Sequence, residues 1–450
     1  MKNMEEIDIR SPVEKAAKML SKMNLDFFDV YAAYSRSLSI EVLGKGIKEA
    51  VSRTDLGLGV RAYKNKGLGV AYSQSLKTED IETTVRKAVS FATVAQPDPH
   101  FKGMPGPSKA PKVEGLCDPE VASLSLDDAG KLVKNMIEAV ESVRKGAMYA
   151  GGLGAGHMKG FLVTSTGVSV EAEKTSVSAA IVPTYKEGDD IGSSSEYDYA
   201  ISLKEIDFEK IGKQAAEKAI EQFGSERVES GILPIILTPE SSSSLVFSLL
   251  GAISGESVVK GRTYASGCLG KQIAPPFFSV VDDGTIPGAI SSGAFDGEGV
   301  PRRRVVAIEK GVVKTFLHNY YSAGILGVEP TGHAVRGGYG GHVGAGPTNV
   351  QVEPGDSTLD EMVAETKTGI LATNMSFTPN TVSGEFSSTI DEGFLIKNGE
   401  KKHPVKNLMV GGHMLELFRD IELVSKEGRT IGKGYFFPNI KLKQIKLAGK

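Results

Sequence analysis

Apolar residues recur at helical spacing in five segments of the chain. In the first segment, Ser11 and Glu14 suit a capping box, and Pro12 suits the first turn of a helix. Val13 and Leu20 then lie on one apolar face. The five segments cover approximately residues 11–23, 78–95, 125–143, 208–223 and 238–250. We predict an α-helix in each of them.

Short apolar runs bounded by turn residues fill much of the remaining chain. The clearest runs are residues 29–34, 37–42, 57–63, 68–73, 164–166, 168–170, 176–181, 232–237, 279–282, 304–309, 312–317 and 394–396. Such runs predict β-strands. Gly44-Lys45-Gly46 and residues 64–67 predict turns between the early strands, and Asn398-Gly399 predicts a tight hairpin near the end.

This order of elements predicts an α+β fold with two parts. The N-terminal part is an α/β region of mixed helices and strands, and the C-terminal part is a β-rich domain with antiparallel and mixed sheets. Residues 96–119 are rich in proline and lack periodicity, which predicts an extended linker. We expect an N-terminal α+β domain at 1–105, a central α+β domain at 106–226 and the β-rich domain at 227–450. The first two form one unit in an alternative division.

The length and composition agree with a soluble protein of two or three domains. The chain has 450 residues, of which 40% are hydrophobic and 24% charged, with 52 Lys and Arg against 55 Asp and Glu. Because no segment is strongly basic, we expect no nucleic-acid partner. The N-terminal sequence MKNMEEIDIR lacks the apolar core of a signal peptide, and no apolar run is long enough to span a bilayer. These features predict a cytoplasmic protein without a membrane partner.

The two cysteines carry no metal or disulfide signature. Cys117 and Cys268 lie far apart in the sequence, and neither belongs to a CxxC motif. We expect unpaired, buried thiols in a reducing compartment, with a single disulfide between them as the alternative.

The glycine-rich run Gly151–Gly156 is the first candidate for a ligand-binding motif. A dinucleotide-binding loop requires a strand before the glycines and a helix after them, whereas here a predicted helix precedes them and the apolar run 161–163 follows. We therefore predict a flexible hairpin at this position. The serine run Ser241–Ser244 lacks the elbow sequence of a nucleophile and is typical of a first helical turn.

The seven histidines include no HExxH pair. His333 and His342 flank a glycine-rich loop at residues 336–341, where a zinc site completed by a carboxylate is one reading. The other reading is that both histidines anchor the loop. Residue types and spacing alone thus identify no catalytic group.

Taken in order, several segments make the chain resemble the TldD/PmbA family of peptidase proteins over most of its length. In the N-terminal part these are Asp29-Val30, Gly44-Lys45-Gly46 and Gly57-Leu58-Gly59-Val60-Arg61-Ala62. In the C-terminal half they include Val281-Asp282-Asp283-Gly284-Thr285, Phe295-Asp296-Gly297-Glu298-Gly299-Val300-Pro301, Pro330-Thr331-Gly332-His333 and Glu353-Pro354-Gly355-Asp356.

The chain differs from the catalytic subunit of that family in two places. There, HExxxH on a helix supplies two zinc ligands and the glutamate that activates water, and a late cysteine completes the site. The corresponding positions here are approximately Val246, Phe247 and Gly251, and residues 431–437 contain no cysteine. The resemblance therefore implies a TldE (PmbA-type) subunit that binds no metal or other cofactor, with zinc held by an HExxxH-bearing, TldD-like partner.

In this family the resemblance implies a cytoplasmic heterodimer that hydrolyses peptides or unfolded segments in an enclosed chamber. The present chain would shape the chamber and bind substrate, and could form a homodimer when isolated. Two alternatives stay open. One is an assembly or regulatory factor, in line with the family's older label of modulator of DNA gyrase. The other is an autonomous, metal-independent hydrolase.

The glycine-rich loop supplies the candidates for substrate contact. We expect His333, Arg336, Tyr339, His342 and Asn349 to lie near the path of a bound peptide, because polar and aromatic side chains alternate there with glycine. Packing of this loop at the dimer interface is the alternative.

Overall fold

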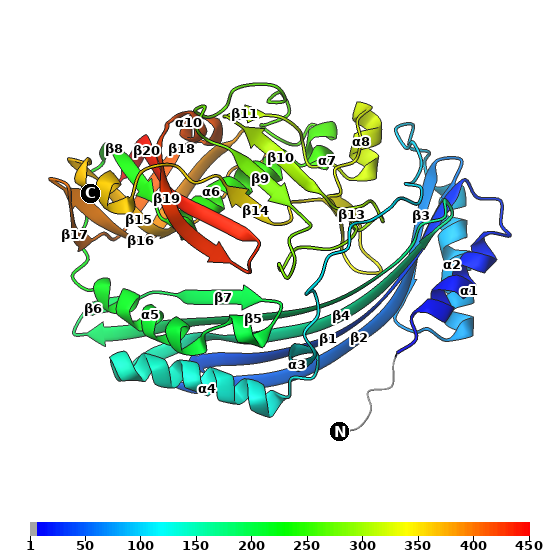
Figure 1. The fold of residues 1–450 in the computed structure, drawn as a ribbon, viewed down its shortest axis with the longest axis horizontal. Coiled ribbons are helices and arrows are strands. Elements are labelled where there is room, and N and C mark those ends of the chain that lie inside the picture. Colours follow the sequence, from blue (N-terminus) through cyan, green and yellow to red (C-terminus); the bar gives the residue numbers. More distant parts are fainter. Residues whose placement is uncertain (1–6) are drawn as a thin grey trace.

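The computed structural model describes residues 7–450 and contains two layers (Figure 1). A long, curved antiparallel sheet carries helices on its outer face, and the C-terminal domain lies within its concave side. The α+β class with a β-rich C-terminal domain is confirmed. Residues 1–6, which include most of the charged N-terminal sequence, lie outside the described residues.

The first sheet joins strands from both of the regions predicted as N-terminal and central domains. Its strand order is β3-β2-β1-β4-β5-β6, with β7 also paired to β5. The strands are β1 (Phe27–Gly44), β2 (Gly46–Lys64), β3 (Gly67–Ser73), β4 (Met148–Thr164), β5 (Ser169–Glu187), β6 (Asp190–Ser193) and β7 (Glu196–Ala200). Because β1 pairs with both β2 and β4 along nearly its full length, the two regions share one continuous backbone ladder.

Two groups of helices cover the outer face of this sheet. The helices α1 (Arg10–Leu20) and α2 (Thr78–Val94) lie at one end, and α4 (Leu126–Val143) and α5 (Phe208–Glu221) lie at the other. Each group packs its apolar stripe on the strands and forms a core of its own. Shorter turns, α3 (Pro119–Ala122) and the 3-10 helix Leu203–Glu205, complete this part.

The C-terminal domain is built on a mixed sheet. Its strand order is β11-β10-β9-β14-β20-β18-β16-β15-β8, with β17 on β16 and β19 on β20; β14 runs parallel to β20, and β15 parallel to β8. The strands are β8 (Gly231–Leu237), β9 (Val280–Asp283), β10 (Arg304–Glu309), β11 (Val312–Val313), β14 (Val350–Val352), β15 (Thr368–Met375), β16 (Glu385–Lys397), β17 (Glu400–Pro404), β18 (Leu408–His413), β19 (Ile421–Ile431) and β20 (Tyr435–Ala448).

Short helices and one separate hairpin complete this domain. The helices are α6 (Pro239–Ala252), α7 (Gly255–Val259), α8 (Tyr320–Leu326), α9 (Leu359–Ala364) and α10 (Met414–Arg419). The hairpin consists of β12 (Ala334–Arg336), β13 (Val343–Ala345) and the glycine-rich loop between them. Residues 334–345 are called the joint hairpin below, because they reach from the C-terminal domain to the first sheet.

Most elements predicted from periodicity are confirmed. The segments 78–95, 125–143, 208–223 and 238–250 are α2, α4, α5 and α6, and Ser125 caps α4 by accepting the Asp128 N–H at 3.1 Å. The Asn398-Gly399 turn joins β16 to β17 with positive φ at both residues. The linker has neither helix nor strand from residue 95 to 118. Both cysteines are free thiols, as predicted, but only Cys268 is buried, whereas Cys117 is exposed. No helix in residues 7–450 is long and apolar enough to cross a membrane.

Several local predictions are wrong. The predicted strand 164–166 is a turn that follows the end of β4 at Thr164, and of the predicted strand 312–317 only Val312–Val313 is a strand. The capping box at Ser11 and Glu14 does not form, because the helix already begins at Arg10 and the Asp8 carboxylate accepts the backbone N–H groups of Arg10 and Ser11 at 2.9 and 3.0 Å. The runs 29–34 and 37–42 belong to one strand, β1, since no turn residue separates them.

The predicted flexible hairpin at Gly151–Gly156 is also wrong, because these glycines lie inside β4 between β1 and β5. A Cβ atom on Gly152 would lie 1.8 Å from the carbonyl oxygen of Ile40, and Gly152 has φ of +146°. Glycine is therefore required here for backbone conformation and close strand approach, which sequence alone does not distinguish from a turn.

Candidate functional site

The joint hairpin packs on bare backbone of β2. A Cβ atom on Gly59 would lie 1.6 Å from the Tyr339 carbonyl oxygen, and one on Gly57 would lie 2.4 Å from the Tyr339 ring. The Tyr339 hydroxyl donates to Asp55 Oδ1 at 2.9 Å. The Gly-Leu-Gly sequence of β2 thus provides the seat for the tip of the hairpin.

A buried cluster of charges fixes the base of the same hairpin. Asp29 of β1 accepts from Arg61 Nε at 2.7 Å and from Arg336 Nη2 at 3.1 Å, so that one carboxylate joins both layers. Burial alone would raise the pKa of Asp29, but the two guanidinium groups hold it below its ordinary value. The Arg336 guanidinium also lies 5.1 Å from the centre of the Tyr31 ring.

Two cavities lie on either side of the joint hairpin. Residues 340–343 line the first cavity, of about 460 Å³, and residues 334–336 with Gly338 and Tyr339 line the second, of about 770 Å³. Both volumes fall within the range of about 300–1,000 Å³ that is common for small-ligand sites.

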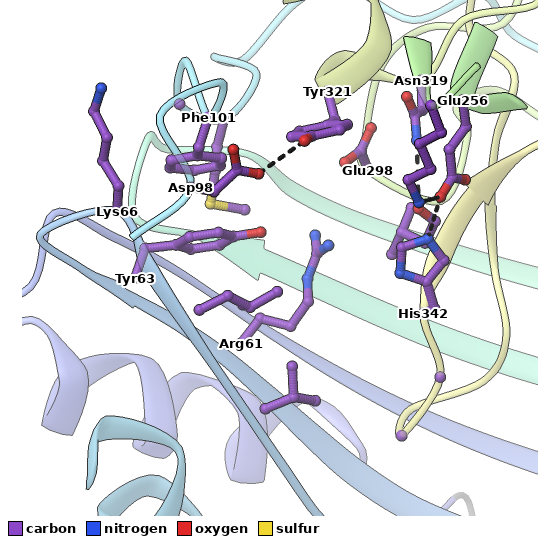
Figure 2. A pocket seen from close by; sticks show the side chains of 18 residues that line it. Arg61, Tyr63, Lys66, Asp98, Phe101, Glu256, Glu298, Asn319, Tyr321 and His342 are labelled. Atoms are coloured by element: carbon purple, nitrogen blue, oxygen red, sulfur yellow. Dashed lines mark hydrogen bonds and ion pairs between the residues drawn. The ribbon is translucent and has the colours of Figure 1, made fainter. Parts of the chain in front are cut away.

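Aromatic rings form one wall of the first cavity (Figure 2). Tyr63 and Phe101 stack with their centroids 4.0 Å apart, and the Tyr321 hydroxyl donates to Asp98 Oδ2 at 2.8 Å. Figure 2 shows Arg61 and Glu298 between this wall and the Glu256–His342 side of the cavity. The cavity therefore combines an apolar wall with charged groups at its floor.

Glu298 is the most perturbed acid of this cavity. The residue is only 8% exposed, and the Glu298 Oε2 atom accepts the Tyr320 N–H at 2.7 Å. Burial raises the pKa of Glu298 to about 7, an effect that the nearby charge of Arg61 reduces and that of Asp296 reinforces. Among the ion pairs formed by residues 7–450, none includes Glu298. A carboxyl group in this state can donate or accept a proton near neutral pH.

The structure brings three of the predicted contact residues to these cavities. His342 lines the first cavity, and its Nε2 lies 2.7 Å from Glu256 Oε1, with 72% of the side chain exposed. Arg336 and Tyr339 line the second cavity. Their contact with a substrate stays a prediction.

The other two predicted contact residues are buried in the C-terminal domain. The residue His333 is 1% exposed, and its Nε2 lies 3.3 Å from Asp282 Oδ1. Asn349 is fully buried, and its Nδ2 donates to the Asp283 carbonyl at 2.6 Å and to Ser292 Oγ at 2.8 Å. In this arrangement both side chains hold loops of the domain together, and their contact with a substrate stays a prediction.

Sequence reasoning missed the charged residues Arg61 and Glu298 of the first cavity and Asp29, which binds Arg61. Asp29 and Arg61 lie within otherwise apolar strands, and that pattern is a signal that was present in the sequence. Glu298 had no comparable signal, because its run of acidic residues and glycine is also typical of a turn.

Two regions of this chain correspond to those that carry the zinc ligands in the catalytic subunit of the family it resembles. These two regions lie side by side in the structure. The Phe247 ring of α6 lies 5.6 Å from the Tyr435 ring and 5.4 Å from the Phe437 ring, centre to centre. Tyr199 of the first sheet packs against Tyr435 from the other side at 6.1 Å. Val246 is fully buried in the core. Aromatic rings thus occupy the space between α6 and β20, and imidazole, thiolate and carboxylate groups do not meet there.

One group of metal-ligating side chains meets elsewhere in residues 7–450, where donor atoms of Cys117, His157 and Glu173 lie within 4.8 Å of one another. The Glu173 carboxylate already contacts His157 Nε2 at 2.7 Å and the Lys159 ammonium at 3.4 Å. Burial and the Glu173 charge raise the pKa of the Cys117 thiol, which disfavours the thiolate that a zinc ion requires.

Comparison with known proteins agrees with this fold over the whole chain. A protein described as a metalloprotease TldD homolog of Buchnera aphidicola is 26% identical, with 96% of this chain and 95% of the relative aligned. Metalloprotease PmbA of Escherichia coli is 23% identical over 94% of this chain and 93% of its own length. The crystal structure of TldE from Thermococcus kodakarensis is 26% identical, has a TM-score of 0.87, and covers 98% of this chain and 99% of its own.

Three family models match successive parts of the sequence. PmbA/TldA metallopeptidase domain 1 matches residues 28–92, the central domain of that family matches 119–223, and its C-terminal domain matches 230–449. Together these matches cover most of the sequence in the order of the family. The chain therefore belongs to the TldD/PmbA family of metallopeptidase-type proteins.

Proposed function

We propose that this chain is the non-zinc-binding subunit of a TldD/TldE-type metalloprotease complex that acts on peptides or unfolded segments. The observation that carries the proposal is the packing of Phe247 against Tyr435 and Phe437, at the place where the resemblance puts the metal ligands of the catalytic subunit. Aromatic rings in contact leave no room for a tetrahedral zinc site with a bound water.

The known relatives support this proposal. Several similar proteins are named metalloproteases of the TldD or PmbA type, and one solved structure of the same fold is named TldE. An HExxxH-bearing paralogue would supply the zinc ion and the activated water in a cytoplasmic heterodimer. The present chain would contribute the concave wall of the sheet and the two cavities beside the joint hairpin.

The experiment compares the isolated chain with its complex. The chain and an HExxxH-bearing paralogue from the same source are purified alone and together, and zinc content and cleavage of an unstructured peptide are measured. We expect less than stoichiometric zinc and no cleavage for this chain alone, and chelator-sensitive cleavage for the complex. A partner whose motif glutamate is replaced by glutamine is the matched control and should form the complex without cleaving.

Three results would contradict the proposal. One tightly bound zinc ion per isolated chain would place a metal site in this subunit. Cleavage by the isolated chain that survives chelators would indicate an autonomous hydrolase. A stable complex in which the partner cleaves equally well with and without this chain would indicate an assembly factor.

A further inference from the structure

Two basic side chains line the second cavity from opposite layers. Lys174 lies on β5, and Arg302 lies in the C-terminal domain between β9 and β10. Val177 of the same strand packs into the core beneath the helices. Because side chains alternate along a strand, Lys174 faces the opposite side, toward the C-terminal domain.

Neither base has a carboxylate partner within ion-pair distance in the described part of the chain. The Lys174 ammonium donates to the Ser292 carbonyl at 2.7 Å, and Arg302 Nε donates to the Phe295 carbonyl at 3.2 Å. Uncharged carbonyl groups therefore hold both cations in place without neutralising them.

The nearest acids are engaged in other contacts. Asp296 accepts backbone N–H groups of Glu298, Val300 and Ala334 at 2.9, 3.0 and 2.9 Å. Asp282 accepts the Thr348 N–H at 2.7 Å. Both carboxylates attract Arg302 from a distance, but neither contacts it.

The missing carboxylate partners shift the pKa values of these two cations in the opposite direction to the pKa of Arg61 in the Asp29 cluster. There, two guanidinium groups share one carboxylate, and Asp29 keeps the pKa of Arg61 above its ordinary value against the effect of burial. In the second cavity, burial and then the charge of Arg302 lower the pKa of Lys174 to about 8. Burial likewise lowers the pKa of Arg302. Two partly buried cations of this kind are stabilised by an anion placed between them.

We infer that Lys174 and Arg302 form a subsite that binds a carboxylate group of a peptide in the second cavity. The inference rests on the proposed function, because it specifies which chemical group of a substrate the chain holds. The same cavity is also lined by four acids, Asp55, Glu171, Glu173 and Asp296. Their charges disfavour a dianion such as phosphate more than a single carboxylate. The carboxylate is either the C-terminus of the peptide or an acidic side chain.

Binding of three peptides to the isolated full-length chain distinguishes these sources. The probes are an N-acetylated Ala/Val tetrapeptide with a free C-terminus, its C-terminal amide, and an amide in which one residue is Glu. Isothermal titration at pH 7 should give at least tenfold tighter binding for the free acid, the Glu-containing amide, or both, than for the plain amide. The preferred probe identifies the source.

Substitutions then test the two bases. Lys174→Met and Arg302→Met should each lower the ratio of the affinity for the preferred carboxylate peptide to that for the plain amide by at least tenfold. Each variant leaves the carboxylate with only one counter-charge. Lys174→Arg should retain this ratio. Lys186→Met is the matched control, since Lys186 is exposed on the same strand and lies outside the cavity lining, and it should leave binding unchanged.

Equal binding of all three peptides, or a preference that survives Lys174→Met and Arg302→Met, would overturn the inference. Competition by inorganic phosphate at least as strong as that by the free acid would also overturn it, because it would indicate a general anion site. These measurements need neither zinc nor a partner, so their failure is separate from any failure to cleave peptides in the complex.

Discussion

Glu298 offers a direct test of the electrostatics of the first cavity. The carboxyl group is buried, accepts one backbone N–H bond from Tyr320, and has a pKa of about 7 instead of the ordinary 4.5. Glu298→Gln keeps the size of the side chain and an oxygen that can accept the same N–H bond, but it carries no charge at any pH.

The sign of the effect follows from the direction of the shift. Because the pKa is raised in the folded state, ionisation of Glu298 destabilises folding. The cost is absent well below pH 4.5, grows as pH rises toward 7, and is complete above pH 7. A shift from 4.5 to about 7 corresponds to about 3 kcal/mol at most. We therefore expect the Gln variant to be more stable than the native chain by about 3 kcal/mol at pH 8 and by less than about 1 kcal/mol at pH 5.

The assay is urea unfolding of both chains at four pH values from 5 to 8, followed by circular dichroism. Glu329→Gln is the matched control, because Glu329 is exposed and forms no ion pair in the described residues. Its unfolding should differ from that of the native chain by a constant small amount. A Glu298→Gln variant that is less stable than the native chain at pH 8 would refute the reasoning, since it would mean that Arg61 stabilises the ionised carboxylate more than burial destabilises it.

Three further substitutions test the joint between the layers. Gly59→Ala should displace the joint hairpin, because its Cβ would lie 1.6 Å from the Tyr339 carbonyl oxygen. Hydrogen exchange at residues 334–345 should therefore accelerate. Gly46→Ala is the control and should not have this effect, because the space around its Cβ is free. Asp29→Asn leaves two buried guanidinium groups without a counter-charge and should lower the free energy of unfolding by about 3–5 kcal/mol. Lys174→Met should raise it by up to about 3 kcal/mol at pH 7. The pKa of Lys174 is lowered in the folded state, so the extra stability of the Met variant should disappear as pH rises from 8 to 10.5. Urea or thermal unfolding over this pH range measures it.

Local periodicity was sufficient to predict the five long helices, because each one buries a single apolar stripe on a neighbouring sheet, but it did not predict the short helices α3 and α7 to α10. Val133 and Met136 of α4 illustrate the rule, and both are fully buried. Periodicity failed at Gly151 and Gly152, whose role depends on how closely β1 and β5 approach them. The distance between these strands depends on tertiary packing, and the residues next to Gly151 and Gly152 in the sequence do not indicate it.

The candidate site was less predictable than the fold. The first cavity is lined by Arg61, Glu256 and His342, which come from β2, α7 and the joint hairpin and are far apart in sequence. The resemblance to a known family identified the segment that carries Arg61, but it did not indicate that Arg61 faces a common space with Glu256 and His342. Only the packing of the C-terminal domain on the concave sheet creates that space.

Three of the segments that made the chain resemble its family meet at the joint hairpin, namely Asp29-Val30, Gly57–Ala62 and Phe295–Pro301. Gly59 leaves room for the tip of the joint hairpin, and Asp29 binds Arg336 at the base of the hairpin. Gly297 allows the Arg336 backbone to approach, since a Cβ there would lie 2.8 Å from its nitrogen. Glu298, the next residue, then enters the first cavity. Motifs that are separate in sequence therefore act as one mechanical unit, and a change at any of them should alter the cavities on both sides of the hairpin.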